Sequence, residues 1–272
     1  MRSEFPLRLL LPVVFIVLGL GGACGERIEP GDLTVETHEL GLEGAQRVSA
    51  EIDMAFGKLT VVGGSRDLLD AEFTYNIEDW KPVIDYEVDG DVGELVLKQP
   101  ESRGRTFGRG VRNEWRLAFG DDAPLDITME VGAAGCVMDL GGVPVSRMNL
   151  KFGAGDVDIT IGDSPTLQDM KLEAGAGNIR VDLRGDWGVD LNARIKAGVG
   201  RVVIDLPQDT GVRIETSKGI GKVSLSGLHR RGDYYVNDAY GKTDVELDLK
   251  VEAGVGAIEL RVGEGEDVGV TI

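Results

Sequence analysis

The residues of this chain that could do chemistry are few and scattered. Among 272 residues there are two cysteines, Cys24 and Cys136, and two histidines, His38 and His229. A zinc site needs four ligands drawn from Cys, His and carboxylate side chains, usually at short characteristic spacings. No such spacing occurs in this sequence. We therefore predict no metal site and no cofactor.

Aspartates at one repeated position are the second set of candidates. Asp139, Asp182 and Asp205 each stand five residues after the same small residue of a recurring phrase, and Thr160 interrupts the series. Stacked carboxylates could bind calcium or a carbohydrate in an adhesion module, although the phrase is not the nonapeptide calcium repeat. A β-solenoid polysaccharide-active enzyme would need two carboxylates about 5–9 Å apart in a cleft. We favour a simpler interpretation, a solvated acidic face.

Residues 1–24 have the layout of a secretion signal. Arg2 and Arg8 give a basic start, and the twelve-residue apolar run Leu9–Leu20 follows. A basic start, an apolar run and small residues at a cleavage site are typical of a signal peptide. The apolar run is short for a transmembrane helix.

The last five residues of this segment, "LGGAC", end in Cys24. They resemble the lipobox of bacterial lipoproteins, in which a signal peptidase cuts before a cysteine that carries a diacylglyceryl group. Gly21 stands where that motif usually has leucine, so cleavage after Ala23 without lipidation, or a retained anchor, stays open. We expect lipidation of Cys24 and attachment to the membrane through this lipid.

One phrase occurs in six copies in the second half of the chain. The second small residue of each copy serves as its anchor: Ala134, Gly155, Gly177, Gly200, Gly221 and Gly256. The copies are Met129–Leu140, Leu150–Ile161, Leu172–Leu183, Ile195–Leu206, Thr216–Gly227 and Val251–Val262. Counted at the anchor, the steps between copies are 21, 22, 23, 21 and 35 residues. A period in the low twenties, without proline inside the phrase, favours stacked β coils over helical repeats.

These repeats predict an all-β fold, a β-solenoid or stacked sheet of roughly 21-residue GxG repeats with an N-terminal β domain. We divide the chain into the signal peptide (1–24), an acidic tether (25–46), the N-terminal β domain (47–128) and the repeats (129–272). The distal part of the tether can enter the fold.

Each copy alternates apolar and polar residues, which predicts a strand with one buried face. Two residues after the anchor stand Cys136, Val157, Ile179, Val202, Val223 and Ile258. Cys136 is therefore expected to be a small buried apolar residue rather than a reactive thiol. If Cys24 is lipidated, Cys136 has no disulfide partner, whereas an unmodified secreted chain reopens a bond between the two.

Glycines fall at one site between the two strands of each copy. They are Gly132, Gly153, Gly175, Gly198, Gly219 and Gly254. We predict a corner that needs backbone without a side chain or with positive φ, and glycine supplies both. A phosphate-binding glycine loop is the weaker alternative because the GxG opens no helix.

Charged residues occupy an outward position four residues before each anchor. In chain order this column reads Glu130, Lys151, Glu173, Lys196, Ser217 and Glu252. If the coils stack in chain order, opposite charges alternate up one face. We interpret this column as a device that fixes register rather than as a binding stripe.

The chain has a formal net charge of −18. Such a surface repels phosphate backbones, so we expect no nucleic-acid partner. Unassisted docking on anionic lipid headgroups is disfavoured for the same reason.

Two segments outside the repeated phrase stand out. The loop Glu101–Arg112 holds Arg103, Arg105, Arg109 and Arg112. We favour its interpretation as a solvated loop over the alternative, a contact with an anion or a lipid headgroup. The excursion Gly227–Thr243 holds Tyr234, Tyr235 and Tyr240. These tyrosines could form an interaction patch, but we favour a cap on the open edge of the stack. The tripeptide Arg231-Gly232-Asp233 matches an adhesion motif that recurs by chance.

Strands are also expected before the repeats. The segment "AFGKLTV" (Ala55–Val61) is related to the later phrase. The other candidates are Ala71–Ile77, Val83–Val88, Glu94–Lys98, Asn113–Phe119 and Leu125–Val131.

The order and spacing of these segments resemble those of the toast-rack proteins. The resemblance rests on "AEIDMAFGKLTVVGG", "GELVLKQ", "NEWRLAF", the GxG repeats and "YYVNDAYGKTDVELDLKVEAGVGAIEL", and it spans Gly41–Ile272. In that family a toast-rack N-terminal domain precedes a β stack related to adhesin-like and envelope stress-regulator (LiaF-type) domains. The resemblance implies a stacked β fold on the extracytoplasmic side of a bacterial membrane, and it brings no catalytic residues.

Together these observations favour a non-enzymatic, lipid-anchored cell-envelope protein. It would act as a scaffold or interaction module linked to envelope sensing or stress, with another envelope protein as its partner. The alternatives are a calcium- or carbohydrate-binding adhesion module and, less favoured, a polysaccharide-active enzyme.

Overall fold

The computed structural model describes residues 27–100, 106–107 and 109–263. This part of the chain is all-β apart from one 3-10 helix, η1 (Glu78–Trp80), and it contains no helix long and apolar enough to cross a membrane. In chain order the strands are β1 (Arg27–Ile28), β2 (Thr34–Leu40), β3 (Arg47–Gly63), β4 (Leu69–Tyr75), β5 (Val83–Asp89), β6 (Val92–Lys98), β7 (Thr106–Phe107), β8 (Asn113–Phe119), β9 (Leu125–Asp139), β10 (Val145–Ala154), β11 (Val157–Thr160), β12 (Asp169–Ala176), β13 (Ile179–Asp182), β14 (Leu191–Leu206), β15 (Gly211–Ser226), β16 (His229–Arg231), β17 (Tyr234–Val236) and β18 (Glu246–Val262).

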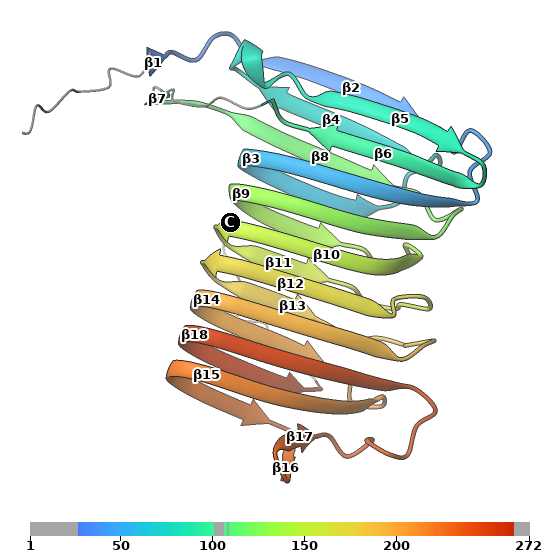
Figure 1. The fold of residues 1–272 in the computed structure, drawn as a ribbon, viewed down its shortest axis with the longest axis vertical. Helices are drawn as coiled ribbons and strands as arrows, with labels where there is room; N and C mark the ends of the chain where they lie inside the picture. The colour runs from blue at the N-terminus through green and yellow to red at the C-terminus, as the bar shows by residue number, and fades with distance from the viewer. Residues whose placement is uncertain (1–26, 101–105, 108, 264–272) are drawn as a thin grey trace, which may run out of the picture.

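The strands stack as coils, each of which crosses the molecule twice (Figure 1). The first half of β9 pairs with β10, and its second half pairs with β11, both in parallel. In the same way β14 pairs with β12 and then with β13. The coils therefore build two facing layers. We call the layer of β10 and β12 the first layer and that of β11 and β13 the second layer.

The core lies between the two layers. In β9, Ile127 and Met129 point inward from the first layer, and Cys136 and Met138 point inward from the second; all four are at most 1% exposed. The alternation expected for the repeated phrase is confirmed in the first and sixth copies, on β9 and β18. In the fourth copy Val203 and Asp205 are buried as well, and in the fifth copy, on β15, the inward positions are only partly buried or exposed. Burial of this apolar surface is the main favourable term in folding.

Cys136 is one of these inward residues and is 1% exposed. Burial raises the pKa of its thiol to about 12. At neutral pH the side chain is therefore a neutral thiol with little nucleophilic character. The expectation of a small buried apolar residue is confirmed.

The last two copies of the phrase do not stack in chain order. β18 lies between β14 and β15, so the sixth copy is inserted between the fourth and the fifth. The expected charge column is correct from Glu130 to Lys196 and wrong beyond it. Glu252, rather than Ser217, lies beside Lys196, with 3.8 Å between the charged groups. Insertion of β18 thus continues the alternation of charge by one more strand.

The glycine corners bring the backbones of neighbouring coils into contact. A Cβ on Gly198 would overlap the carbonyl oxygen of Gly175, its equivalent in the preceding coil. The anchor Gly200 meets Gly177 in the same way and also has φ +144°. The sequence pattern predicts both close backbone approach and positive φ at the first glycine of the GxG. In the structure the first glycine, such as Gly198, allows close approach only, and the second, such as Gly200, allows close approach and has the positive φ.

Before the repeats, the fold continues as further strands of the same sheet. β3 pairs in parallel with β9, with β6 through its first half and with β8 through its second. The expected strands are found with ends shifted by at most two residues, with two exceptions. β3 begins at Arg47, eight residues before Ala55, and β9 runs on from Val131 to Asp139 through the first copy of the phrase. β2 lies within residues 25–46 and pairs with β4, so the distal part of the expected tether belongs to the sheet.

The tyrosine-containing excursion covers part of the last coil. β16 and β17 form an antiparallel hairpin, and β17 pairs with Arg213 and Ile214 of β15. The hairpin lies at one end of the stack (Figure 1). The interpretation as an edge cap is therefore confirmed only at these two residues of the first layer.

The glycine corner generates a stability prediction. We expect Gly200→Ala to lower the free energy of unfolding by about 2–4 kcal/mol, because the new Cβ meets the Gly177 carbonyl at a positive φ. The matched control is Gly135→Ala, where a Cβ has nothing within 4 Å, and we expect a change below about 0.5 kcal/mol. Urea unfolding followed by circular dichroism measures both values. Equal losses in the two variants would contradict this role of the corner.

Candidate functional site

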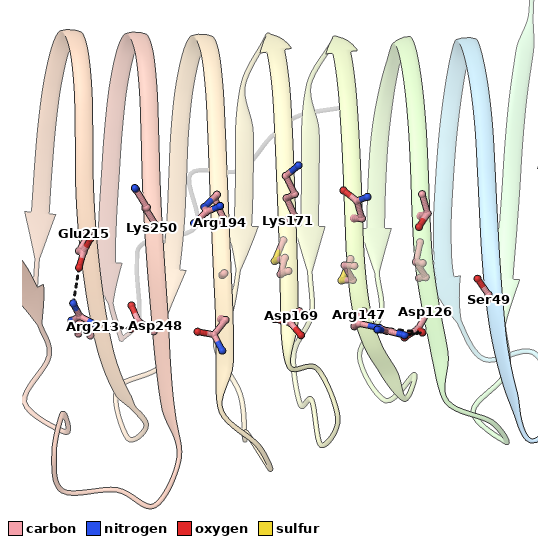
Figure 2. A pocket seen from close by; sticks show the side chains of 17 residues that line it. Ser49, Asp126, Arg147, Asp169, Lys171, Arg194, Arg213, Glu215, Asp248 and Lys250 are labelled. Atoms are coloured by element: carbon pink, nitrogen blue, oxygen red, sulfur yellow. Dashed lines mark hydrogen bonds and ion pairs between the residues drawn. The ribbon is translucent and has the colours of Figure 1, made fainter.

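A groove of about 690 Å³ crosses the outer face of the first layer. Its lining comes from β3, β9, β10, β12, β14, β18 and β15, so it runs across the strands rather than along one of them. Figure 2 shows the side chains standing on neighbouring strands in rows. Each row holds one equivalent position of successive coils, because the strands pair in parallel and in register.

One of the two outward rows of the groove contains three neighbouring cations. Lys171 on β12 lies beside Arg194 on β14, and Arg194 lies beside Lys250 on β18. Figure 2 shows them across three adjacent strands. Neighbouring strands are about 4.8 Å apart, and like charges directly opposite one another destabilise a sheet. The fold thus keeps an unfavourable cationic row in the groove.

Acidic neighbours neutralise two of these three cations. The Lys171 ammonium lies 3.0 Å from Glu173, and that of Lys250 lies 3.4 Å from Glu252. The hydrogen bond from Lys171 lowers the pKa of the Glu173 carboxyl. Arg194 forms no ion pair with any described residue and is exposed. Its guanidinium is the cation of the row that is available to an anion.

Ion pairs stand on either side of the cationic row. Arg147 lies 2.5 Å from Asp126 at the β9 side, and Arg213 lies 2.7 Å from Asp248 and 2.6 Å from Glu215 at the β15 side. These pairs are drawn as dashed lines in Figure 2. The groove therefore presents the unpaired positive charge of Arg194, whereas at its β15 end a single arginine, Arg213, faces two carboxylates.

The side chains that line the groove are polar and charged, with Ile127, Met148, Met170 and Ala193 between them. None of them is aromatic, histidine or cysteine. Three of their four carboxylates, those of Asp126, Asp248 and Glu215, form ion pairs with arginines, and the fourth is that of Asp169. The arrangement can hold a polar, charged ligand by ion pairs and hydrogen bonds.

The aspartate column lies on the other outer face, in the second layer. Asp182 and Asp205 are direct neighbours there, and Thr160 separates them from Asp139. Asp182 lies 2.5 Å from Arg184. Burial alone raises the pKa of Asp182, but hydrogen bonds from Arg184 outweigh burial and leave that pKa lowered.

Asp205 is the most buried member of the column, at 1% exposed. Its Oδ2 lies 3.1 Å from Arg180, and its Oδ1 lies 3.8 Å from Arg261 without a hydrogen bond. Among the residues that the structure describes, no group of three or more His, Cys, Asp or Glu could hold a metal ion. The expected acidic face is thus an arginine-paired network over Asp182 and Asp205, and a solvated one only at Asp139.

The other expected positions are only partly described. Cys24, Arg103 and Arg105 lie outside the described residues. Arg112 is paired with Glu114 at 2.7 Å, which leaves Arg109 as an exposed basic residue of that loop.

The tyrosines of the excursion pack against the end of the stack. The rings of Tyr234 and Tyr240 are 6.3 Å apart and edge to face, and the Arg213 guanidinium lies 4.8 Å from the centre of the Tyr234 ring. All three tyrosines are half-buried, Tyr235 included. This packing fits a role in capping the end of the stack better than a role as an exposed interaction patch.

The cationic row was missed by sequence reasoning. In chain order its column reads Lys171, Arg194, Glu215 and Lys250, so an acid interrupts the cations. Only the insertion of β18 beside β14 brings the three cations together. A comparison of all outward columns under both orders of the last two copies would have revealed it.

Solved structures of other proteins are similar to this chain to different degrees, and one of them shares its fold. A "putative cell adhesion protein" from Clostridium sporogenes is 26% identical, with a TM-score of 0.68 over 85% of this chain and 100% of that chain. A "putative adhesin" from Bacteroides fragilis, 13% identical, covers 86% of this chain and 99% of its own at a TM-score of 0.35. A "putative lipid binding protein" from Parabacteroides distasonis covers the same shares at 11% identity and the same TM-score.

No curated protein matches the chain. A family model does: it is described as the N-terminal domain of toast_rack, DUF2154, and it matches residues 29–166 and 163–205. The two matches together span more than half of the 272 residues. They include the strands before the repeats and the first four copies of the phrase. The chain therefore belongs to the toast-rack family.

Proposed function

We propose that this protein is a non-enzymatic adhesion or interaction module of the bacterial cell envelope. The observation that carries the proposal is the similarity to the Clostridium sporogenes protein, whose name describes cell adhesion and whose whole length is matched. Adhesion requires an extended, rigid surface displayed outside the cytoplasm. A stack of coils with two outer faces provides such a surface.

The side chains support binding without catalysis. The thiol of Cys136 is buried between the layers and protonated at neutral pH. Asp182 and Asp205 are held by arginines. A glycosidase needs two carboxylates that face a cleft with distinct protonation states, whereas these carboxylates are fixed in ion pairs on an outer face.

The finer architecture that we propose is a β-solenoid scaffold built from the GxG repeats. Equivalent residues of neighbouring copies pair one to one, as Ile195 does with Leu172 and Val251. Such a scaffold repeats each outward position at a fixed spacing along the stack. The groove over Arg194 is the face that we assign to ligand binding, since it combines a cavity with an unpaired cation.

Attachment to the membrane is the second part of the proposal. The lipobox-like "LGGAC" places Cys24 three residues before the first described residue, Arg27. A diacylglyceryl group on Cys24 would hold the module at the extracytoplasmic surface of a membrane. Two acyl chains give a stable anchor, whereas one chain gives only marginal binding.

The arginine-paired aspartates generate a test against the calcium-binding alternative. We expect Asp205→Ala to lower the free energy of unfolding by about 2 kcal/mol, because Arg180 and Arg261 lose a buried partner. Asp139→Ala, at the exposed end of the same column, is the control and should change it by less than about 0.5 kcal/mol. Calcium should leave the melting temperature of the unaltered protein unchanged. A calcium-dependent rise that disappears in Asp205→Ala would instead support a calcium site.

The anchor is tested by intact-mass analysis of the membrane fraction. We expect a mature chain that starts at Cys24 and carries added acyl mass. Cys24→Ala should lose both the acyl mass and the membrane association. Cys136→Ala, which removes the buried thiol, is the control and should keep both. An unmodified soluble chain starting at Cys24 would reject the anchor and favour a secreted binding protein.

A further inference from the structure

Both ends of the stack leave sheet edges unpaired among the described residues. At one end β2 pairs only with β4, and β5 pairs only with β6. At the other end the hairpin of β16 and β17 covers only Arg213 and Ile214 of β15. The second half of β15, Lys218–Ser226, pairs on one side with β18 and has no described strand on its other side. An unpaired edge is a template for another strand.

Exposed apolar side chains gather at these same edges. Ten large hydrophobic residues of the described chain are exposed, and six of them lie on or beside an end strand. They are Leu33 (51% exposed), Val35 (55%), Val83 (52%) and Val88 (37%) at the first end, and Ile220 (76%) and Leu225 (37%) at the second. Apolar surface concentrated in this way marks an interaction site more often than apolar residues scattered singly do.

The two ends carry opposite charge. β2 and β5 together hold five acids and no lysine or arginine: Glu36, Glu39, Asp85, Glu87 and Asp89. The open half of β15 holds Lys218 and Lys222 and no acid, and β16 adds Arg230 and Arg231. The stack is thus acidic at its β2 end and basic at its β15 end, within a chain whose net charge is −18.

We propose that copies of this protein associate head to tail, with the open half of β15 in one copy against β2 of the next. Both strands belong to the second layer, so the contact would continue that layer from one copy into the other. A two-fold symmetric contact would bring Lys222 towards Lys222, or Glu39 towards Glu39, and charge opposes both. A head-to-tail contact pairs opposite charges and leaves each end free to add another copy. The inference goes beyond the proposed function and depends neither on the lipid nor on the groove.

Lysine on an edge strand also has a protective role, since it discourages edge-to-edge pairing. That role predicts a monomer. It does not account for the acidic opposite end or for Ile220, the most exposed large apolar residue described. The two explanations therefore predict different oligomeric states. Variants in which the charge at one end of the stack is reversed can distinguish between them.

The test is sedimentation velocity of the full chain carrying Cys24→Ala, at increasing protein concentration. We expect species that grow beyond a dimer without a fixed size. Lys222→Glu should weaken association about tenfold, because it places an acid against Glu39 of the next copy. Glu39→Lys should weaken it similarly. An equimolar mixture of the two variants should restore association, since each altered end then meets an opposite charge.

Lys58→Glu is the matched control, because it makes the same charge change at an exposed position on β3, in the middle of the stack. We expect it to leave association unchanged. A monomer at every concentration, a closed dimer, or equal weakening by Lys58→Glu and Lys222→Glu would each overturn the proposal. So would a failure of the mixture to restore association while each variant keeps the melting temperature of the parent.

Discussion

The backbone contact at the glycine corners is the constraint on which the rest of this structure depends. Each corner glycine faces a carbonyl oxygen of the neighbouring coil with no room for a Cβ. Gly198 contacts Gly175, Gly254 contacts Gly198, and Gly219 contacts Gly254. Because the backbone itself sets this distance, the flat layers on both sides of the corner keep the strand spacing of a regular sheet.

Because of this regular spacing, residues at the same position in successive copies of the phrase lie side by side and form columns across the sheet. Inward columns fill the core, and outward columns place equal positions of successive coils side by side. Function then depends on which residues stand in each outward column. On the first layer Lys171, Arg194 and Lys250 make a cationic row, and on the second layer Asp182 and Asp205 are locked by arginines. One scaffold thus has one outer face with an unpaired cation, which we propose as the ligand-binding face, and one whose charges are paired internally.

Much of the fold could be predicted from the sequence because the governing patterns are local. Period-two alternation identified the strands, and Asn113–Phe119 was predicted with both ends correct. The toast-rack resemblance agrees with the family match over residues 29–205. The cap formed by the tyrosine excursion was also inferred, since an open edge needs cover.

The order of the last two copies could not be obtained from periodicity, which shows that copies stack but not which copies are neighbours. The residues do contain a physical reason. The fifth copy has Thr216 and Gly227 at inward positions, where the sixth has Val251 and Val262. The more apolar copy gains more by lying between two coils, and the more polar copy costs less at the end of the stack. The cationic row of the groove depends on this order and was missed with it.

The division of the chain into two β domains at residue 128 remains a prediction. β3, from the first predicted domain, pairs with β9 on both sides of Thr128, so the hydrogen bonding marks no boundary there. The lipid on Cys24 also remains a prediction, since that residue lies outside the described chain.

Disulfide cross-linking across the corner tests the stacking order most directly. Val199 and Val255 are exposed and paired on neighbouring strands, as are Val255 and Ile220, whereas Val199 and Ile220 are separated by one strand. Neighbouring Cα atoms about 4.8 Å apart are within disulfide range, and atoms two strands apart are not. We predict that cysteine pairs at 199/255 and 255/220 form bonds under mild oxidation and that 199/220 does not. A bond at 199/220, with none at 199/255, would show that the copies stack in chain order and would contradict both the inserted strand and the cationic row.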